Sequence, residues 1–475
     1  MKNLKSNISE IFTLFFVLFL FIGIRIISIF LTPLELSADE GQYWLWSNEL
    51  NWGYFSKPPM IAWVISLSTF LISDQQFGIR IFAPLFHGFT GLTIYILVKK
   101  LSENNRMVSL TSILIWLSMP IIGVGSFIMS TDTPLMFFWS LGLLSIFYAQ
   151  NSNKNFAWSL SGGIAGLAML TKYAAVFLPL GLLLWFLFGK KKLIKINSLI
   201  FYILGFLIIW SPNLIWNLIN DFSTISHLSD NAVINAPNFS LIGSVFFLSS
   251  QLFVLGPILF FVSIISIWGF WKDSENHHWL GWFAAPVYIL MTIQGFFSEA
   301  NANWAATALP SLTIFCSIFL KNVKLLSILG IFLNILISLF IVLVVIKGSF
   351  NPINLNSDPL RRLKGWEILA SNIKSIDYKY IVVNRRGIAA PLIYYLRESD
   401  LQVRVVSSVK NPANYYQKKY PFNSKESEKF LFVSEIKESF PFAKQEYKIT
   451  HLKTLETKIS KDKERKLYFY HVNRK

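Results

Sequence analysis

Long apolar runs dominate this chain and constrain its fold more than any other feature. Residues Ile11 to Leu31 are 21 consecutive positions with a single charge, Arg25, and about 20 apolar residues are enough to cross a bilayer. Only 15% of the 475 residues are charged and 53% are hydrophobic, whereas soluble domains carry about 25% charged residues. The sequence therefore predicts an integral membrane protein.

The apolar runs recur along the first three quarters of the chain. The first exceeds the roughly 7–15 residues of a signal-peptide core, so we expect a retained helix. A run over 59–73 suits an interfacial or re-entrant helix better than a span. The predicted fold class is an α-helical polytopic membrane protein with about eleven transmembrane helices, near 11–32, 78–98, 107–128, 134–149, 157–171, 173–188, 197–217, 243–270, 279–297, 304–320 and 325–346.

Basic residues orient these helices, because cytoplasmic loops carry an excess of Lys and Arg. If the N-terminus is cytoplasmic, the opposite side receives only Lys57, Arg80 and Lys172 before the C-terminal tail. The loop over 33–77 and the tail are therefore predicted to face outward. The cytoplasmic side receives thirteen basic residues: Lys2, Lys5, Lys99, Lys100, Arg106, Lys154, Lys190, Lys191, Lys192, Lys195, Lys272, Lys321 and Lys324.

The tail has a different composition from the apolar part. Residues 347–475 hold 26 of the 43 Lys and Arg residues but 13 of the 26 Asp and Glu residues. A basic surface suits nucleic acid, anionic lipid or phosphorylated glycans, and the outward orientation argues against nucleic acid. Strand patterns at 380–384, 429–434 and 467–471, with a helix at 389–397, predict a small α/β domain. We divide the chain into a transmembrane domain, 1–346, and this domain, 347–475.

Two adjacent acids, Asp39 and Glu40, open the first outward loop. Ser37 and Glu40 have the spacing of a capping box, and acids favour a helix N-terminus; Tyr43, Trp44 and Trp46 would then form an interfacial aromatic belt. The alternative function is a general base beside a second acid. We regard Asp39 and Glu40 as candidate catalytic residues.

Four cations are candidates for binding a lipid phosphate: Lys57, Arg80, Lys172 and Arg361. Lys57 precedes two prolines, which hold it in extended geometry, and it either snorkels to head groups or binds phosphate. Arg80 and Lys172, like Arg25, are candidates because a charge inside a membrane is by default a functional hypothesis. Arg361 begins a basic cluster that suits phosphate or anionic lipid.

A further set of polar and aromatic residues suits substrate binding. Asp132 is either the Asx residue of a turn before Pro134 or a buried functional carboxylate. Asn301 and Trp304 suit either a turn with belt residues or the docking of a sugar ring. Gln42 and Tyr43 are the other candidates for substrate binding. Histidines show no metal-ligand spacing, and we predict neither a metal nor a cofactor; no phosphate-binding glycine motif is present.

Together these features suit sugar transfer from a lipid phosphate at the outer membrane face. The lipid needs the bilayer, the departing phosphate needs a cation, and the acceptor hydroxyl needs a base. A flippase or exporter of lipid-linked sugars is the alternative. It would use the same charges to bind phosphate, but it needs neither an acid-bearing outward loop nor a folded outward domain.

Five motifs in order carry a family resemblance: A-D-E-G-Q-Y with F-S-K-P-P, T-D-T-P-L, L-T-K-Y, N-W-A-A-T-A-L-P-S-L and D-P-L-R-R-L-K-G-W. They resemble the GT-C glycosyltransferases of the bacterial glycosyltransferase 39/83 type. This type is related to protein O-mannosyltransferases and to the aminoarabinose transferases of lipid A. The resemblance covers residues 1 to about 400.

The resemblance implies inverting transfer from an undecaprenyl-phosphate sugar to a glycolipid, glycan or protein acceptor. It implies a bacterial inner-membrane enzyme with its active site and C-terminal domain in the periplasm. Asp39 matches the catalytic acid of this family, Glu40 the adjacent acid and Lys57 the lysine at the lipid phosphate. Gln42 stands where aminoarabinose transferases have Arg, and Ser56 where they have a Glu implicated in metal binding. Arg80, Lys172 and Arg361 are candidates to replace the missing arginine charge.

Overall fold

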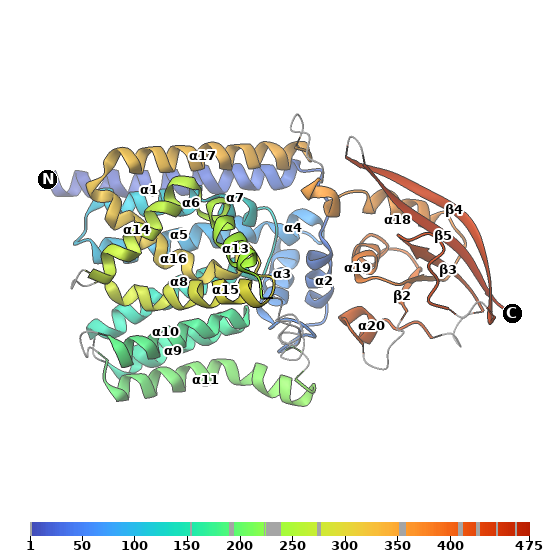
Figure 1. Cartoon of the computed structure of the whole chain (residues 1–475), viewed down its shortest axis with the longest axis horizontal. Coiled ribbons are helices and arrows are strands. Elements are labelled where there is room, and N and C mark those ends of the chain that lie inside the picture. Colours follow the sequence, from blue (N-terminus) through green and yellow to red (C-terminus); the bar gives the residue numbers. More distant parts are fainter. Residues whose placement is uncertain are drawn as a thin grey trace. The chain divides into compact units, whose positions relative to one another are not determined.

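The structure is a computed structural model, and its contacts divide the chain into two compact units (Figure 1). The first unit comprises Met1–Leu31 and Leu50–Leu343, and the second comprises Thr32–Glu49 and Val344–Lys475. The sequence predicted a single boundary between residues 346 and 347. The structure differs because the segment Thr32–Glu49 belongs to the second unit, which resumes at Val344. The structure describes residues 2–152, 154–189, 194–222, 224, 239–272, 277–350, 358–406, 412–423, 428–442, 445–460 and 463–475.

The first unit is built from helices that surround an apolar core. Lys190, Lys191 and Lys192 of the charge analysis lie outside the described residues. The α-helices are α1 (Lys2–Leu31), α3 (Met60–Leu71), α4 (Gln76–Arg80), α5 (Phe82–Leu101), α6 (Arg106–Ser118), α7 (Pro120–Gly125), α8 (Asp132–Ser152), α9 (Asn155–Met169), α10 (Phe177–Phe188), α11 (Ile196–Ile219), α13 (Leu241–Leu255), α14 (Pro257–Lys272), α15 (Ala285–Phe297), α16 (Leu309–Phe319) and α17 (Lys324–Lys347).

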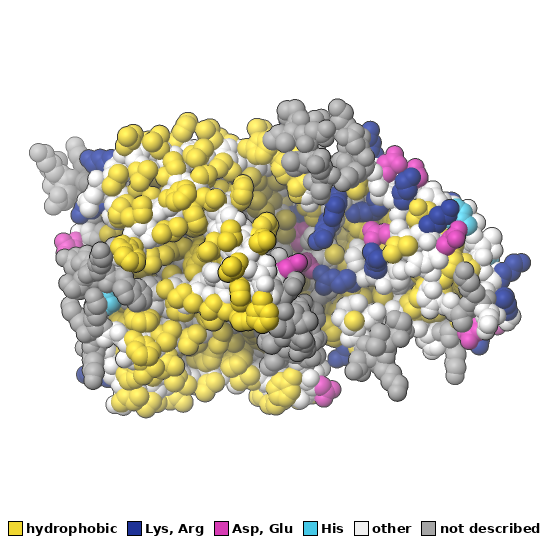
Figure 2. Space-filling view, viewed as in Figure 1, with side chains coloured by type: hydrophobic (Ala, Val, Ile, Leu, Met, Phe, Trp, Pro, Cys, Tyr) yellow, Lys and Arg dark blue, Asp and Glu magenta, His cyan; other side chains and the backbone are white. Residues whose placement is uncertain are grey.

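Fewer helices than predicted are long and apolar enough to cross a membrane. Within the described ranges there are seven such helices, or eight if the bent pair α13 and α14 counts as one span. Their outer surface suits lipid, since hydrophobic side chains predominate on the visible face of this unit (Figure 2). The sequence predicted about eleven spans, and seven or eight of these correspond to described helices of this length.

Helix breaks and short helices account for the difference in number. The expected span 107–128 is interrupted at Met119, and Pro120 begins the separate helix α7. The expected span 243–270 bends by 112° between α13 and α14, where Gly256 has a φ of +90°. The expected spans 157–171 and 173–188 correspond to α9 and α10, which have only 15 and 12 residues. α3, which was not predicted to span, has 12 residues, about 18 Å at 1.5 Å per residue, and is too short to cross a core of about 30 Å.

Small residues bring two helices of the first unit into backbone contact. A Cβ atom on Gly162 of α9 would lie 1.8 Å from the Tyr202 carbonyl oxygen of α11. A Cβ atom on Gly205 of α11 would lie 1.9 Å from the carbonyl oxygen of Ser159. Membrane helices associate closely through such small residues, because close approach increases van der Waals contact.

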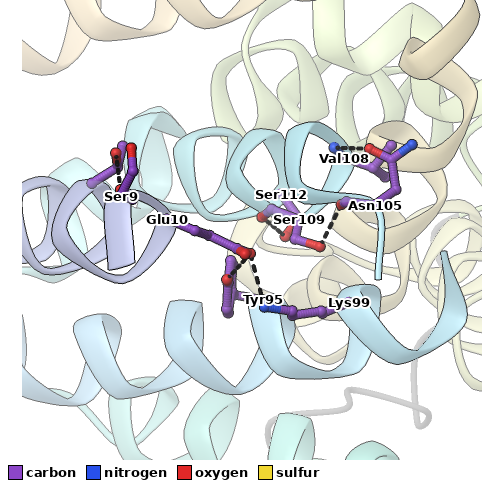
Figure 3. Close-up of polar contacts among 9 residues, drawn as sticks. Ser9, Glu10, Tyr95, Lys99, Asn105, Val108, Ser109 and Ser112 are labelled. Atoms are coloured by element: carbon purple, nitrogen blue, oxygen red, sulfur yellow. Dashed lines mark hydrogen bonds and ion pairs between the residues drawn. The ribbon is translucent and has the colours of Figure 1, made fainter. Parts of the chain in front are cut away.

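Two groups of polar contacts tie α1 to its neighbours. Arg25 is buried, and its Nη2 donates to the Ser338 hydroxyl of α17 over 2.6 Å. Nearer the start of α1, the Glu10 carboxylate accepts hydrogen bonds from the Tyr95 hydroxyl and from Lys99 Nζ (Figure 3). The Lys99 distance is 3.0 Å. Both intramembrane charges of α1 therefore have partners that fix its position against α5 and α17.

The second unit contains a five-stranded sheet in the order β2-β1-β3-β5-β4. Strand β1 (Tyr380–Val383) lies between β2 (Gln402–Val405) and β3 (Lys429–Ser434) and is parallel to both. β5 (Lys463–Arg474) is antiparallel to β3 and forms a long hairpin with β4 (Tyr447–Ser460). The predicted α/β class is correct, whereas β2 and β4 were not predicted.

Apolar side chains cover both faces of this sheet. Ile381 and Val383 of β1 face one apolar cluster, and Val382 faces the other, because successive strand residues point to opposite faces. The first cluster receives the helices α18 (Trp366–Lys374), α19 (Arg386–Tyr395) and α20 (Tyr415–Lys419). It also receives Ala38 and Leu45 of α2 (Ala38–Ser47). The loop helix that carries the candidate acids is thus part of this unit's core.

Candidate active site

The capping box predicted at the start of α2 is present. The Ser37 hydroxyl accepts from the Glu40 backbone N–H over 3.1 Å, and the Glu40 carboxylate accepts from the Ser37 backbone N–H over 3.0 Å. Glu40 is fully buried, so its carboxylate fixes the first helical turn. Asp39, one residue earlier, keeps 60% of its side chain exposed. The two adjacent acids therefore have different environments.

Asp39 forms an ion pair with a residue that the sequence did not single out. Arg386 Nη2, from the first turn of α19, donates to Asp39 Oδ1. Arg386 is 347 positions away in the chain. Its only signal in the sequence is its place in Asn384-Arg385-Arg386-Gly387, directly after the predicted strand. Arg361, a predicted source of the missing cationic charge, belongs to the same unit.

The aromatic residues of α2 pack inside the second unit. Trp44 makes an edge contact with Tyr394 of α19, with ring centroids 4.9 Å apart. Trp46 makes an edge contact with Tyr415 of α20 at 5.7 Å. Both tryptophans are buried, as are Gln42 and Tyr43. An aromatic belt facing lipid head groups is therefore the wrong interpretation of these positions.

Arg361 lies on a short 3-10 helix, Pro359–Leu363, that polar contacts hold in place. Asp358 caps this helix by accepting from the Leu360 N–H over 2.8 Å, and it also pairs with Lys364 over 2.7 Å. Arg465 of β5 donates to the carbonyl oxygens of Arg361 and Lys364. The backbone beneath the exposed Arg361 side chain is thus fixed from the sheet.

Glu35 connects this basic segment to the chain before α2. Its carboxylate accepts from the backbone N–H of Trp366 over 2.5 Å and from that of Glu367 over 3.3 Å. Both N–H groups belong to the first turn of α18, where donors have no partner within the helix. Burial raises the pKa of Glu35 above its usual value, although these hydrogen bonds act in the opposite direction.

In the first unit, Lys57 ends a bend over residues 55–57 and precedes α3. The Tyr54 N–H donates to the Lys57 carbonyl oxygen over 3.0 Å, and Pro59 is the N-cap of α3. The Met60 N–H donates to the Leu170 carbonyl oxygen over 2.9 Å. This hydrogen bond joins the K-P-P motif to the L-T-K-Y motif, which lies more than a hundred residues later.

Asp132 brings three motifs of the first unit together. Its Oδ1 pairs with Lys172 Nζ over 2.6 Å, and its Oδ2 accepts from Asn303 Nδ2 over 2.8 Å. Both charged side chains are largely buried. Asn303 was not a predicted site residue; Asn301 and Trp304 were, and they flank it at the 3-10 helix Ala302–Ala308. The buried Asp132 carboxylate, which accepts from both donors, therefore positions Lys172 near the N-terminus of α8.

The remaining predicted cation, Arg80, ends α4 and is almost fully buried. A buried guanidinium requires partners or a polar cavity, since its desolvation is costly. Within the described ranges, no cluster of three or more His, Cys, Asp or Glu side chains is arranged to bind a metal ion.

Several known proteins have sequences similar to this one over long stretches. Residues 56–216 match the family described as dolichyl-phosphate-mannose-protein mannosyltransferase. The lipid A galacturonosyltransferase RgtD of Rhizobium johnstonii is 30% identical over 427 residues, which are 86% of this chain and 88% of that protein. An undecaprenyl phosphate-alpha-4-amino-4-deoxy-L-arabinose arabinosyl transferase of Pseudomonas fluorescens is 27% identical over 154 residues, 31% of this chain and 27% of its own.

Solved structures share the fold. ArnT from Cupriavidus metallidurans bound to undecaprenyl phosphate has a TM-score of 0.68 at 14% identity, and covers 95% of this chain and 97% of its own. The apo state of ArnT has a TM-score of 0.69 at 12% identity. The chain therefore belongs to the GT-C glycosyltransferase family that includes RgtD, and it is a multi-pass membrane glycosyltransferase. The family and enzyme class predicted from the sequence are confirmed.

Proposed function

We propose that this enzyme transfers a sugar from undecaprenyl phosphate to lipid A at the periplasmic face of a bacterial inner membrane. The relative that matches most of the chain is named a lipid A galacturonosyltransferase. The structure with the same fold was solved with undecaprenyl phosphate. A carrier of lipid-linked sugars has no comparable support, because these named relatives are transferases.

A uronic acid is the sugar class that the relatives favour. The match to the galacturonosyltransferase covers 86% of the chain, whereas the match to the aminoarabinose transferase covers 31%. Gln42 and Ser56 also depart from the aminoarabinose pattern. We therefore propose polyprenyl-phosphate galacturonic acid as the donor.

In this mechanism Asp39 is the general base. Its carboxylate accepts the proton of an acceptor hydroxyl, whose oxygen attacks the anomeric carbon of the sugar from the side opposite the phosphate. The bond from that carbon to the phosphate oxygen breaks, and its electron pair stays on the departing phosphate. The observation that supports this role is an exposed carboxylate on a capped, packed helix turn. Glu40 serves by fixing that turn.

Cations stabilise the departing phosphate in this mechanism. Lys57, at a defined turn before α3, is the first candidate, because an ammonium is a strong point charge for phosphate. Lys172 has three donor hydrogens and, among the described residues, uses one on Asp132, so it has further donors for an anion. Arg80 and Arg361 remain candidates for the same charge. Gln42, Tyr43, Asp132, Asn301 and Trp304 remain candidates for contacts with the substrates.

Replacing Asp39 with Asn tests this function. Purified protein in detergent is supplied with undecaprenyl-phosphate galacturonic acid, or with the aminoarabinose donor, and with lipid A. Mass spectrometry follows the product. We expect wild-type transfer of the uronic acid and a loss of about 10²–10⁴-fold in Asp39→Asn, the contribution of a positioned base.

The matched control is Glu49→Gln. Glu49 is an exposed acid of the same segment and pairs with Lys419 over 2.6 Å. Its replacement therefore tests whether the loss of another exposed ion pair in this unit also lowers activity. Full activity in Asp39→Asn would contradict the assignment, and transfer of neither sugar by the wild type would contradict the proposed function.

A further inference from the structure

We infer that Arg386 is a positioning residue for Asp39: its guanidinium holds the carboxylate so that one oxygen stays available to the acceptor. This inference rests on the proposed function and adds a residue to it. It begins from a contact inside the second unit, where Arg386 Nη2 donates to Asp39 Oδ1. Among the described residues this contact uses Oδ1 only, so Oδ2 remains available as a proton acceptor.

The ion pair is not needed to hold the two helices together. α2 and α19 meet through a close backbone approach, since a Cβ atom on Gly41 would lie 3.3 Å from the Ala390 carbonyl oxygen. They also meet through the buried Trp44 and Tyr394 rings. The side chains of Asp39 and Arg386 are 60% and 42% exposed, and exposed ion pairs contribute little to stability. The pair therefore orients a side chain more than it stabilises the fold.

The electrostatics of the helix ends favour the same assignment. Asp39 lies in the first turn of α2 and Arg386 in the first turn of α19. The positive end of a helix dipole stabilises an anion and disfavours a cation. Arg386 is therefore placed against the dipole of its own helix, and the Asp39 carboxylate offsets that cost. The N-terminus of α2 and the Arg386 guanidinium therefore both act on the Asp39 carboxylate.

The neighbouring arginine shows how specific the arrangement is. Arg385 directly precedes Arg386, yet it points to Glu435, with 3.6 Å between Nη1 and Oε2. It is also exposed, at 53% of its side chain. Arg385 and Arg386 are therefore two exposed arginines in one segment, and only the second contacts the proposed base. Arg385 provides a matched control.

The test compares Arg386→Ala, Arg386→Lys and Arg385→Ala in full-length protein in detergent. The assay uses undecaprenyl-phosphate galacturonic acid and lipid A. We expect Arg386→Ala to lower kcat by about 10–100-fold, since misplacement of a catalytic group by about 1 Å costs about 10²-fold, with KM for the donor changed by less than about 3-fold. Arg386→Lys should recover part of kcat, whereas Arg385→Ala should match the wild type. The unfolding temperatures should agree, because the pair is exposed.

Two further measurements separate positioning from a structural role. Added guanidinium ion at non-denaturing concentration should raise the rate of Arg386→Ala but not that of Asp39→Asn. The double variant Asp39→Asn/Arg386→Ala should be no slower than Asp39→Asn alone, because Arg386 acts through Asp39. An Arg386→Ala enzyme with wild-type kcat, or a double variant slower by the product of the two effects, would overturn the inference alone. A wild type that transfers no sugar would overturn the proposed function together with it.

Discussion

At the scale of single residues, Asp132 shows what a membrane-embedded charge requires. Its two oxygens are engaged by Lys172 and Asn303, which come from motifs that have no common pattern in the sequence. A carboxylate at this depth is tolerated because it is paired and hydrogen-bonded. The alternative interpretation, an Asx residue that serves only its own turn, does not account for these two contacts.

We expect Lys172→Met to destabilise the protein by about 3 kcal/mol, because it leaves a largely buried carboxylate without its cation. The double variant Lys172→Met/Asp132→Asn should regain much of this loss, since the uncompensated charge is removed. Thermal unfolding in detergent measures both changes. Lys466→Met is the control: Lys466 pairs with Glu456 over 2.6 Å on the exposed β4–β5 hairpin, so its loss should change little. Equal unfolding temperatures for Lys172→Met and the wild type would contradict this account.

At the scale of elements, α2 combines the two features that were considered as alternatives for this stretch, a capping box and an exposed acid. The capping box is real and engages Glu40, and the same turn presents Asp39 with an exposed side chain. The capping pattern is local, so the sequence was enough to predict it. The burial of Trp44 and Trp46 depends on α19 and α20, which lie more than three hundred residues later, and local patterns carry no information about such partners.

The glycines of α9 provide a second prediction at this scale. Gly162→Ala should destabilise the first unit by about 1–3 kcal/mol or more, the usual cost of overpacking. The added Cβ would lie 1.8 Å from the Tyr202 carbonyl oxygen, and a backbone atom does not yield easily. Gly163→Ala is the matched control, since its Cβ would make an ordinary contact of 3.5 Å with Ile209. If the two variants unfold at the same temperature in detergent, the close packing of α9 on α11 is wrong.

At the scale of the whole molecule, a segment between two membrane helices belongs to the second unit. Thr32–Glu49 leaves α1 and joins Val344–Lys475, which follows α17. The Glu35 N–H donates to the Leu363 carbonyl oxygen over 2.9 Å, and the Thr32 hydroxyl donates to the Val345 carbonyl oxygen over 2.7 Å. The proposed base therefore moves with the C-terminal domain, and orientation of that domain across the membrane decides which compartment the base faces.

Cysteine labelling tests this orientation. The chain has one cysteine, Cys316, and it is buried, so the background should be low. A membrane-impermeant maleimide should label Asp400→Cys, at an exposed position after α19, in intact spheroplasts. It should label Lys154→Cys, at the exposed turn before α9, only after the membrane is opened. The reverse pattern would place the second unit and Asp39 in the cytoplasm.

The sequence by itself determined the membrane character, the α/β class of the tail and the motifs that identify the family. These properties depend on composition and on neighbours in the chain, because hydropathy, charge bias and capping are local. Only the tertiary structure decided that Arg386 meets Asp39, that Asn303 contacts Asp132, and that Pro120 and Gly256 interrupt expected spans. These outcomes depend on which distant segments pack together, and an arginine after a strand looks the same in the sequence whether or not a carboxylate lies opposite it.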